Sequence, residues 1–353
     1  MEDYLKINRM MEEFYQYVIG YLPHIDSFID IIDSLSKLVI KNVSKYYLEN
    51  DVCPFEQDEF IEMDIFNKIE LIRDFIDCKN ISFDMDKELS SGVIDICCRD
   101  FDDYSSNGQF KQGYNRYNHE HKCIDIHDHG ILLDSVCWIH EIAHFLNQRD
   151  GERSEVGNLF TEAISFFYEL IFMDYLVDHG YPIENYYLDN LDGEAGILKY
   201  SSFFLSLFRT YCKTGEVSID TFHMIYPKRN FEVNEYFEYY QPQDFYYLVQ
   251  DVLDQTELFD SMEAFYSSHL IGILYSFALP IQIYSYQRYL EDSSYYERME
   301  KLNSTINSSS FLECMNVLGI AYPISNEFLE QLEKDTIRYM NQIGDYVKSN
   351  KCI

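Results

Sequence analysis

The sequence has 353 residues, of which 47% are hydrophobic and 17% aromatic, and these values exclude a disordered chain. It contains only 7 Pro and 14 Gly, and so few breakers favour a mainly α-helical protein with a sizeable core. The 61 acidic and 27 basic residues give a net charge of −34, which argues against nucleic acid and anionic membranes as partners.

The acidic charge has two interpretations. It is typical of a soluble, non-aggregating protein, or it belongs to a cleft that attracts cationic or amine-ended peptides. The nine cysteines include no C-x-x-C pair, which favours reduced, buried thiols and a cytoplasmic location. The N-terminus lacks the apolar stretch of a signal peptide, and the apolar run from Leu270 to Tyr284 is too short to span a bilayer.

The first 85 residues predict a helical N-terminal region. Residues 3–50 have helical apolar spacing that is interrupted near Pro23, so we expect two helices there. Residues 56–78 repeat the pattern and predict another amphipathic helix.

Residues 91–130 change character and predict strands. The apolar stretch 92–98 is typical of a strand or of the start of a helix, and it precedes a region of spaced glycines at 107–114. Residues 123–128 then alternate apolar and polar side chains, as a half-buried strand does. We expect a small antiparallel sheet directly before the next helix.

That helix carries the most informative motif of the chain, His140-Glu141-Ile-Ala-His144. Asp134 or Ser135 is the predicted N-cap, and the helix is expected to end near residues 147–148. Positions i and i+4 share one helix face, so both imidazoles can bind one metal ion. The glutamate between them is placed to take a proton from a metal-bound water.

A catalytic zinc ion needs a third protein ligand, and the helix predicted at 158–177 supplies Glu162. This helix is apolar nearly all round, so a carboxylate on it is costly unless it is paired or bound to a metal. Glu169 lies two turns further along the same face. The alternative is that both glutamates lie on a solvated stripe and both histidines in the core. We predict one zinc ion, although this donor set accepts other divalent metals.

The stretch 161–170 resembles the E-x-x-S-x-x-x-E helix of the oligoendopeptidase F and thimet oligopeptidase family, which are gluzincin metallopeptidases. Residues 101–114 look like the G-K-x-x-G-A-Y segment of that family, and residues 124–129 fall where it has a substrate-lining strand. Residues 265–290 and 318–320 are similar to its C-terminal helices. The resemblance covers about residues 90–345.

The resemblance implies a mainly α, zincin-like peptidase that cleaves short unstructured peptides, with residues 86–353 as its catalytic domain. It implies His140, His144 and Glu162 as zinc ligands and Glu141 as the general base. Ser165 and Glu169 would orient a ligand from the second layer around the metal.

Two departures from the family concern the missing N-terminal lobe and the groups that stabilise the oxyanion. The family has a histidine and closely spaced tyrosines late in the chain, whereas this sequence reads Tyr266-Ser-Ser-His269 there. Tyr266, His269 and Tyr275 are the nearby substitutes. The loss of one oxyanion donor costs about 100-fold or more in rate.

Four further histidines precede the motif. His119 and His121 are interpreted as part of a solvated loop. His127 and His129 alternate along the predicted strand, so both can face the cleft and contact substrate.

Three hypotheses follow from the sequence. The first is a cytoplasmic zinc endopeptidase for short peptides. The second is a zinc-bearing relative that binds peptides with weak or no cleavage, and the third is a structural helical protein without metal.

Overall fold

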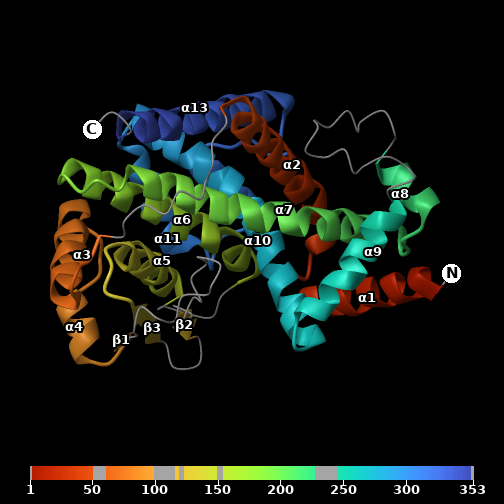
Figure 1. Ribbon diagram of the computed structural model, residues 1–353, viewed down its shortest axis with the longest axis horizontal. Coiled ribbons are helices and arrows are strands. Elements are labelled where there is room, and N and C mark those ends of the chain that lie inside the picture. Colours follow the sequence, from red (N-terminus) through yellow and green to blue (C-terminus); the bar gives the residue numbers. More distant parts are fainter. Residues whose placement is uncertain are drawn as a thin grey trace.

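The computed structural model describes residues 2–50, 61–98, 116–118, 123–148, 154–226 and 245–350. The described part is mainly helical, as predicted, with one three-stranded sheet (Figure 1). The elements in chain order are α1 Glu2–Val18, α2 Ile25–Asn50, α3 Ile65–Lys79, α4 Met85–Ser90, β1 Ile94–Cys98, β2 Arg116–Asn118, β3 Cys123–Asp128, α5 Leu133–Gln148, α6 Glu155–Asp178, α7 Glu184–Thr214, α8 Ile219–Ile225, α9 Phe245–Gln255, η5 Thr256–Leu258, α10 Met262–Glu291, α11 Tyr295–Thr305, α12 Phe311–Leu318 and α13 Asn326–Asn350.

The predicted break near Pro23 is confirmed, because α1 ends at Val18 and α2 begins at Ile25. α2 packs against α7, α10 and α13, so the N-terminal helices bury their apolar faces on the helices that follow. The helix predicted at 56–78 begins later, at Ile65, where the Asp64 carboxylate caps it by accepting the N–H groups of Phe66 and Asn67.

The sheet corrects one prediction. β3 is its central strand and pairs parallel with β1 and antiparallel with β2, in the order β1-β3-β2. The antiparallel prediction was therefore wrong for β1. A parallel pair of strands needs a long crossover connection, and the chain between β1 and β3 is long enough to supply one. The spacing of the two strands along the sequence therefore did not reveal whether they pair parallel or antiparallel.

α5 begins at Leu133, so the N-cap position is Leu132 and the two predicted N-caps, Asp134 and Ser135, were wrong by two and three residues. Asp134 and Ser135 lie in the first turn instead. The Asp134 carboxylate accepts the N–H groups of His129 and Ile131, which precede the helix, and ties the end of β3 to the start of α5.

α6 is the central helix of the site, and it packs against α5 on one side and α10 on another. It is buried along nearly its whole length, as its apolar sequence predicts. The α7–α10 contact depends on Gly272, since a Cβ there would lie 1.9 Å from Ser201 Oγ. These close contacts bring α5, α6, α7 and α10 together around one interior region.

Two helices, α6 and α10, are long and apolar enough to cross a membrane by length and composition. In their most apolar windows, 83% and 67% of the residues are buried inside the protein. α10 is longer than the apolar run predicted from the sequence, and its assignment as a buried helix is confirmed. Cys78, Cys123, Cys137, Cys212 and Cys314 are free thiols.

Candidate metal centre

The two motif histidines meet on one face of α5, as their spacing predicts. Their Nε2 atoms lie 2.9 Å apart, and the rings are nearly perpendicular at an interplanar angle of 81°. His144 is buried and His140 half-buried. Both rings therefore present the same nitrogen to one point.

Glu162 reaches that point from α6. Its carboxylate oxygens lie 3.4 Å from His140 Nε2 and 3.5 Å from His144 Nε2. Zinc bonds of about 2.0–2.1 Å in a tetrahedral site place neighbouring donor atoms roughly 3.3 Å apart. The three measured separations of 2.9, 3.4 and 3.5 Å fit that geometry. Two imidazoles and one carboxylate thus form a donor set suited to a divalent metal ion.

Burial and neighbouring charges shift the pKa values of the cluster in opposite directions. Burial alone would lower the pKa of His140, but hydrogen bonds to Glu162 and Glu169 raise it well above its ordinary value. Burial likewise opposes the ionisation of Glu162, yet His144 and His140 hold its pKa well below the ordinary value. Metal binding at His140 Nε2 is therefore expected to compete with a proton.

The other ring nitrogen of each histidine is also engaged. His140 Nδ1 contacts Glu169 Oε1, and Glu169 Oε2 accepts a hydrogen bond of 3.0 Å from Asn190 Nδ2. His144 Nδ1 lies 2.9 Å from Thr161 Oγ1 and 3.2 Å from Ser165 Oγ. Such partners fix ring orientation and raise ligand basicity. Glu169 and Ser165 thus each contact one of the two motif histidines.

Sequence reasoning missed three residues of this second layer. Thr161 contacts His144, and Asn147 Nδ2 donates to Thr161 Oγ1 at 2.9 Å. Asn190 comes from α7, far along the chain. Asn147 follows His144 by three residues and Thr161 precedes Ser165 by four, so helical spacing in the sequence could have identified both. Nothing in the sequence links Asn190 to the site.

Glu141 and Tyr275 belong to the same region. Glu141 is buried, and its carboxylate is one of the charges that act on Tyr275. The Tyr275 ring packs edge-on against Phe166 at 4.8 Å, and Phe166 lies beside His140. Burial, followed by the carboxylates of Glu162 and Glu169, raises the pKa of Tyr275 well above its ordinary value. Its phenol remains a hydrogen-bond donor beside the cluster.

Tyr266 and His269 have their contacts elsewhere on α10. Tyr266 donates a 3.0 Å hydrogen bond to Glu13 Oε2 and packs against Phe14 of α1. His269 is fully buried and stacks on Phe204 of α7 at 3.8 Å. Neither of its ring nitrogens has a hydrogen-bond partner among the described residues. Of the three predicted oxyanion groups, Tyr275 is the one the structure brings to the metal cluster.

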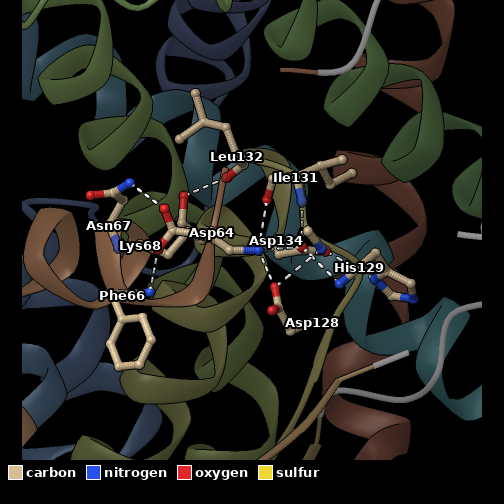
Figure 2. Close-up of polar contacts among 11 residues, drawn as sticks. Asp64, Phe66, Asn67, Lys68, Asp128, His129, Ile131, Leu132 and Asp134 are labelled. Atoms are coloured by element: carbon tan, nitrogen blue, oxygen red, sulfur yellow. Dashed lines mark hydrogen bonds and ion pairs between the residues drawn. The ribbon is translucent and has the colours of Figure 1, made fainter. Parts of the chain in front are cut away.

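His129 is held at the end of β3 by a buried network that the sequence did not reveal (Figure 2). Its Nδ1 lies 2.9 Å from Asp134 Oδ1. Asp134 Oδ2 accepts a hydrogen bond of 2.7 Å from Nζ of the fully buried Lys68. The same Nζ also contacts Asp128 and donates a hydrogen bond of 3.1 Å to the Ile131 carbonyl. The network joins α3, β3 and α5 and fixes the motif helix against the sheet.

Several predicted groups lie outside the described residues. They are the segment 101–114, His119 and His121. The backbone of His127 pairs with Cys97 in the sheet, and its side chain is outside the described part.

No protein-family model matches the sequence. No curated protein matches it either. Among solved structures, the chain is similar to PZ peptidase A with inhibitor 2, at 13% identity and a TM-score of 0.47. The similarity covers 96% of this chain and 59% of that chain, so this chain spans less than two thirds of that peptidase.

Proposed function

We propose that the protein is a zinc-dependent endopeptidase that hydrolyses short unstructured peptides. The observation that carries the proposal is the convergence of His140, His144 and Glu162, whose donor atoms all lie within 4.8 Å of one another. The motif glutamate and a phenol donor lie in the same region. The sequence resemblance of residues 161–170 supports a relationship to the oligoendopeptidase F type, and the five free thiols of the described part support a cytoplasmic location.

Each residue has a defined part in the reaction. His140, His144 and Glu162 would hold a zinc ion, which would supply Lewis-acid polarisation of the scissile carbonyl and a lowered pKa of the attacking water. Glu141 accepts a proton from the attacking water and passes it to the leaving amine. The Tyr275 phenol donates a hydrogen bond to the developing oxyanion. Glu169 keeps the His140 ring oriented through Nδ1.

A second candidate is a zinc-bearing relative that binds peptides with little cleavage. It is favoured by the contacts of Tyr266 and His269, which are made with α1 and α7. In this candidate Tyr275 alone does not stabilise the oxyanion enough for turnover.

Glu141→Gln separates the two candidates. Elemental analysis and cleavage of a quenched peptide library are measured on the wild type and the variant together. The endopeptidase proposal expects one zinc per chain in both proteins and a loss of turnover of about 100- to 10,000-fold in the variant. Equal cleavage by both proteins would contradict the role of Glu141, and zinc without cleavage in the wild type would favour the binding candidate.

A further inference from the structure

One side of α5 stays accessible to solvent while the rest of the helix around it is buried. Leu133, Cys137 and His140 are half-buried, whereas every other residue of 134–143 is buried. Cys137 follows Leu133 by four residues and precedes His140 by three, so the three side chains lie on one side of the helix. His144 follows on the same side after four more residues. This open face of α5, made by Leu133, Cys137 and His140, therefore leads to the metal ligands.

The neighbouring helices become accessible at the same place. Between residues 159 and 173, α6 is buried apart from Glu162. α10 is half-buried at Tyr275 and buried for the next three turns. Glu162 is a ligand of the metal cluster, and Tyr275 lies beside it. The accessible side chains of three helices thus meet at the metal centre, and the open face of α5 is one of its borders.

Leu133 and Cys137 make this border apolar. They are neighbours at i and i+4, so their side chains form one continuous surface. Burial, and then the Glu169 carboxylate, raises the pKa of the Cys137 thiol, and the uncharged thiol behaves as a small hydrophobic group. Along the helix axis, Cys137 lies about 4.5 Å from His140. An extended peptide advances about 3.3 Å per residue, so a side chain close to the cleaved bond can contact Cys137.

The carboxylates that act on Cys137 are those of Glu169, Asp134 and Glu141. Asp134 Oδ2 lies 2.7 Å from Nζ of the buried Lys68. Glu169 contacts a metal ligand through one oxygen and accepts a hydrogen bond through the other. Glu141 is assigned to the attacking water. Because each carboxylate already has a partner or a role, this border favours an apolar side chain of the substrate over a cationic one.

We propose that Leu133 and Cys137 form the wall of a substrate subsite that binds an apolar side chain of the peptide, one or two residues from the cleaved bond. This inference rests on the proposed function and names its substrate class. The bound side chain covers the two half-buried residues and removes apolar surface from water, which supplies the affinity. Cys137 determines the depth of the subsite, because it is the smaller residue and lies closer to the metal ligands.

The test measures binding rather than cleavage. Labelled peptides are titrated by fluorescence anisotropy into zinc-loaded Glu141→Gln protein. Matched peptides carry alanine, leucine, lysine or glutamate at one position at a time. We expect leucine at one position to tighten binding about tenfold or more relative to alanine, because a leucine side chain loses more apolar surface to the subsite. Lysine and glutamate at that position should give no such gain.

Two added substitutions change the wall in opposite directions. Cys137→Phe fills the subsite, and Leu133→Ala removes its outer part, so each should lower the leucine-to-alanine ratio of affinities to about two or less. Cys212→Phe is the matched control and should keep the full ratio. Cys212 is another half-buried free thiol, on α7, and its charged neighbours are Asp26 and Lys213. Elemental analysis confirms that each variant compared holds one zinc per chain.

The outcomes separate the subsite from the proposed function. A leucine preference that is lost in Cys137→Phe or in Leu133→Ala, and kept in Cys212→Phe, would support the subsite. Equal binding of all peptides, a leucine preference that survives both substitutions, or a stronger gain from lysine would overturn the subsite alone. A protein that takes up no zinc or binds no peptide would overturn the proposed function and the subsite with it.

Discussion

The metal cluster between α5 and α6 and the His269 region between α7 and α10 both place histidine in a buried setting, but they differ in what surrounds the imidazole. At the cluster, each ring nitrogen of His140 and His144 has a polar neighbour. Around His269 both nitrogens lack a partner within the described residues, and the ring stacks on Phe204 and Tyr200. The cluster has donor atoms compatible with binding a cation, whereas the His269 region is aromatic core.

The difference shows that burial alone does not mark a functional histidine. Burial lowers the pKa of His269 to about 3 because nothing compensates a charge there. At His140 the same burial is outweighed by two carboxylates. A histidine with a carboxylate on its Nδ1 and a second histidine on its Nε2 is oriented for a metal, and a histidine between rings is not.

The largest expected effect is on metal affinity. Glu162→Gln removes a charged ligand and should weaken zinc binding by more than about 100-fold, because loss of an outer partner alone costs about 10- to 100-fold. His269→Phe should leave zinc affinity unchanged. Competition with a chromophoric chelator measures both. Weak zinc binding in His269→Phe would erase the distinction between the two regions.

Substitution of two tyrosines of α10 tests the difference between the metal cluster and the rest of α10 by its effect on turnover. Tyr275→Phe removes the phenol donor beside the cluster and should lower kcat by about 100-fold with KM little changed. Tyr266→Phe loses a hydrogen bond to Glu13 and should reduce kcat less than about threefold. Steady-state kinetics on one quenched peptide compares them. The reverse ranking would place the oxyanion donor at Tyr266.

Glu169→Gln tests the second layer around the metal. The variant keeps the shape of the side chain but removes the charge that holds the His140 ring. Zinc affinity should fall about 10- to 100-fold while the fold is retained. Chelator competition and circular dichroism report the two quantities, and unchanged affinity would show that Glu169 does not act on the metal through His140.

The smallest effect concerns acid stability. The pKa of His269 is depressed in the folded state, so the unfolded chain gains a proton first and stability falls as pH drops from about 6.5 towards 3. At pH 5 the loss is about 2 kcal/mol. His269→Phe should remove this part of the pH dependence. Urea unfolding at pH 7 and pH 5 measures it, and an unchanged difference between the two pH values would contradict the buried, uncharged state of His269.

The convergence of His140, His144 and Glu162 could be predicted from the sequence because much of it depends on helix geometry. The i,i+4 spacing places His140 and His144 on one face, and the apolar sequence around Glu162 predicts a buried carboxylate. The helices of the N-terminal region and the strand at 123–128 followed from apolar periodicity in the same way. Each of these features depends on local sequence alone.

The parts that could not be predicted depend on contacts between distant segments. Nothing near Asn190 or Lys68 in the sequence shows that the first contacts Glu169 and the second lies buried between Asp128 and Asp134. The direction of β1 relative to β3 depends on how the connecting chain crosses over. Tyr275, rather than Tyr266 or His269, lies near the metal cluster because of the face of α10 that packs on α6. The packing of the whole helical bundle determines which face that is.

The most direct test of the central claim is a zinc titration of metal-free protein with activity followed throughout. A strong chelator is used to strip the wild type, and zinc is then added back while peptide cleavage is recorded. The account predicts no cleavage without metal and a linear rise that ends at one equivalent per chain, with Glu141→Gln binding the same equivalent and remaining inactive. Cleavage that survives complete metal removal, or a chain that binds no zinc at micromolar concentration, would contradict it.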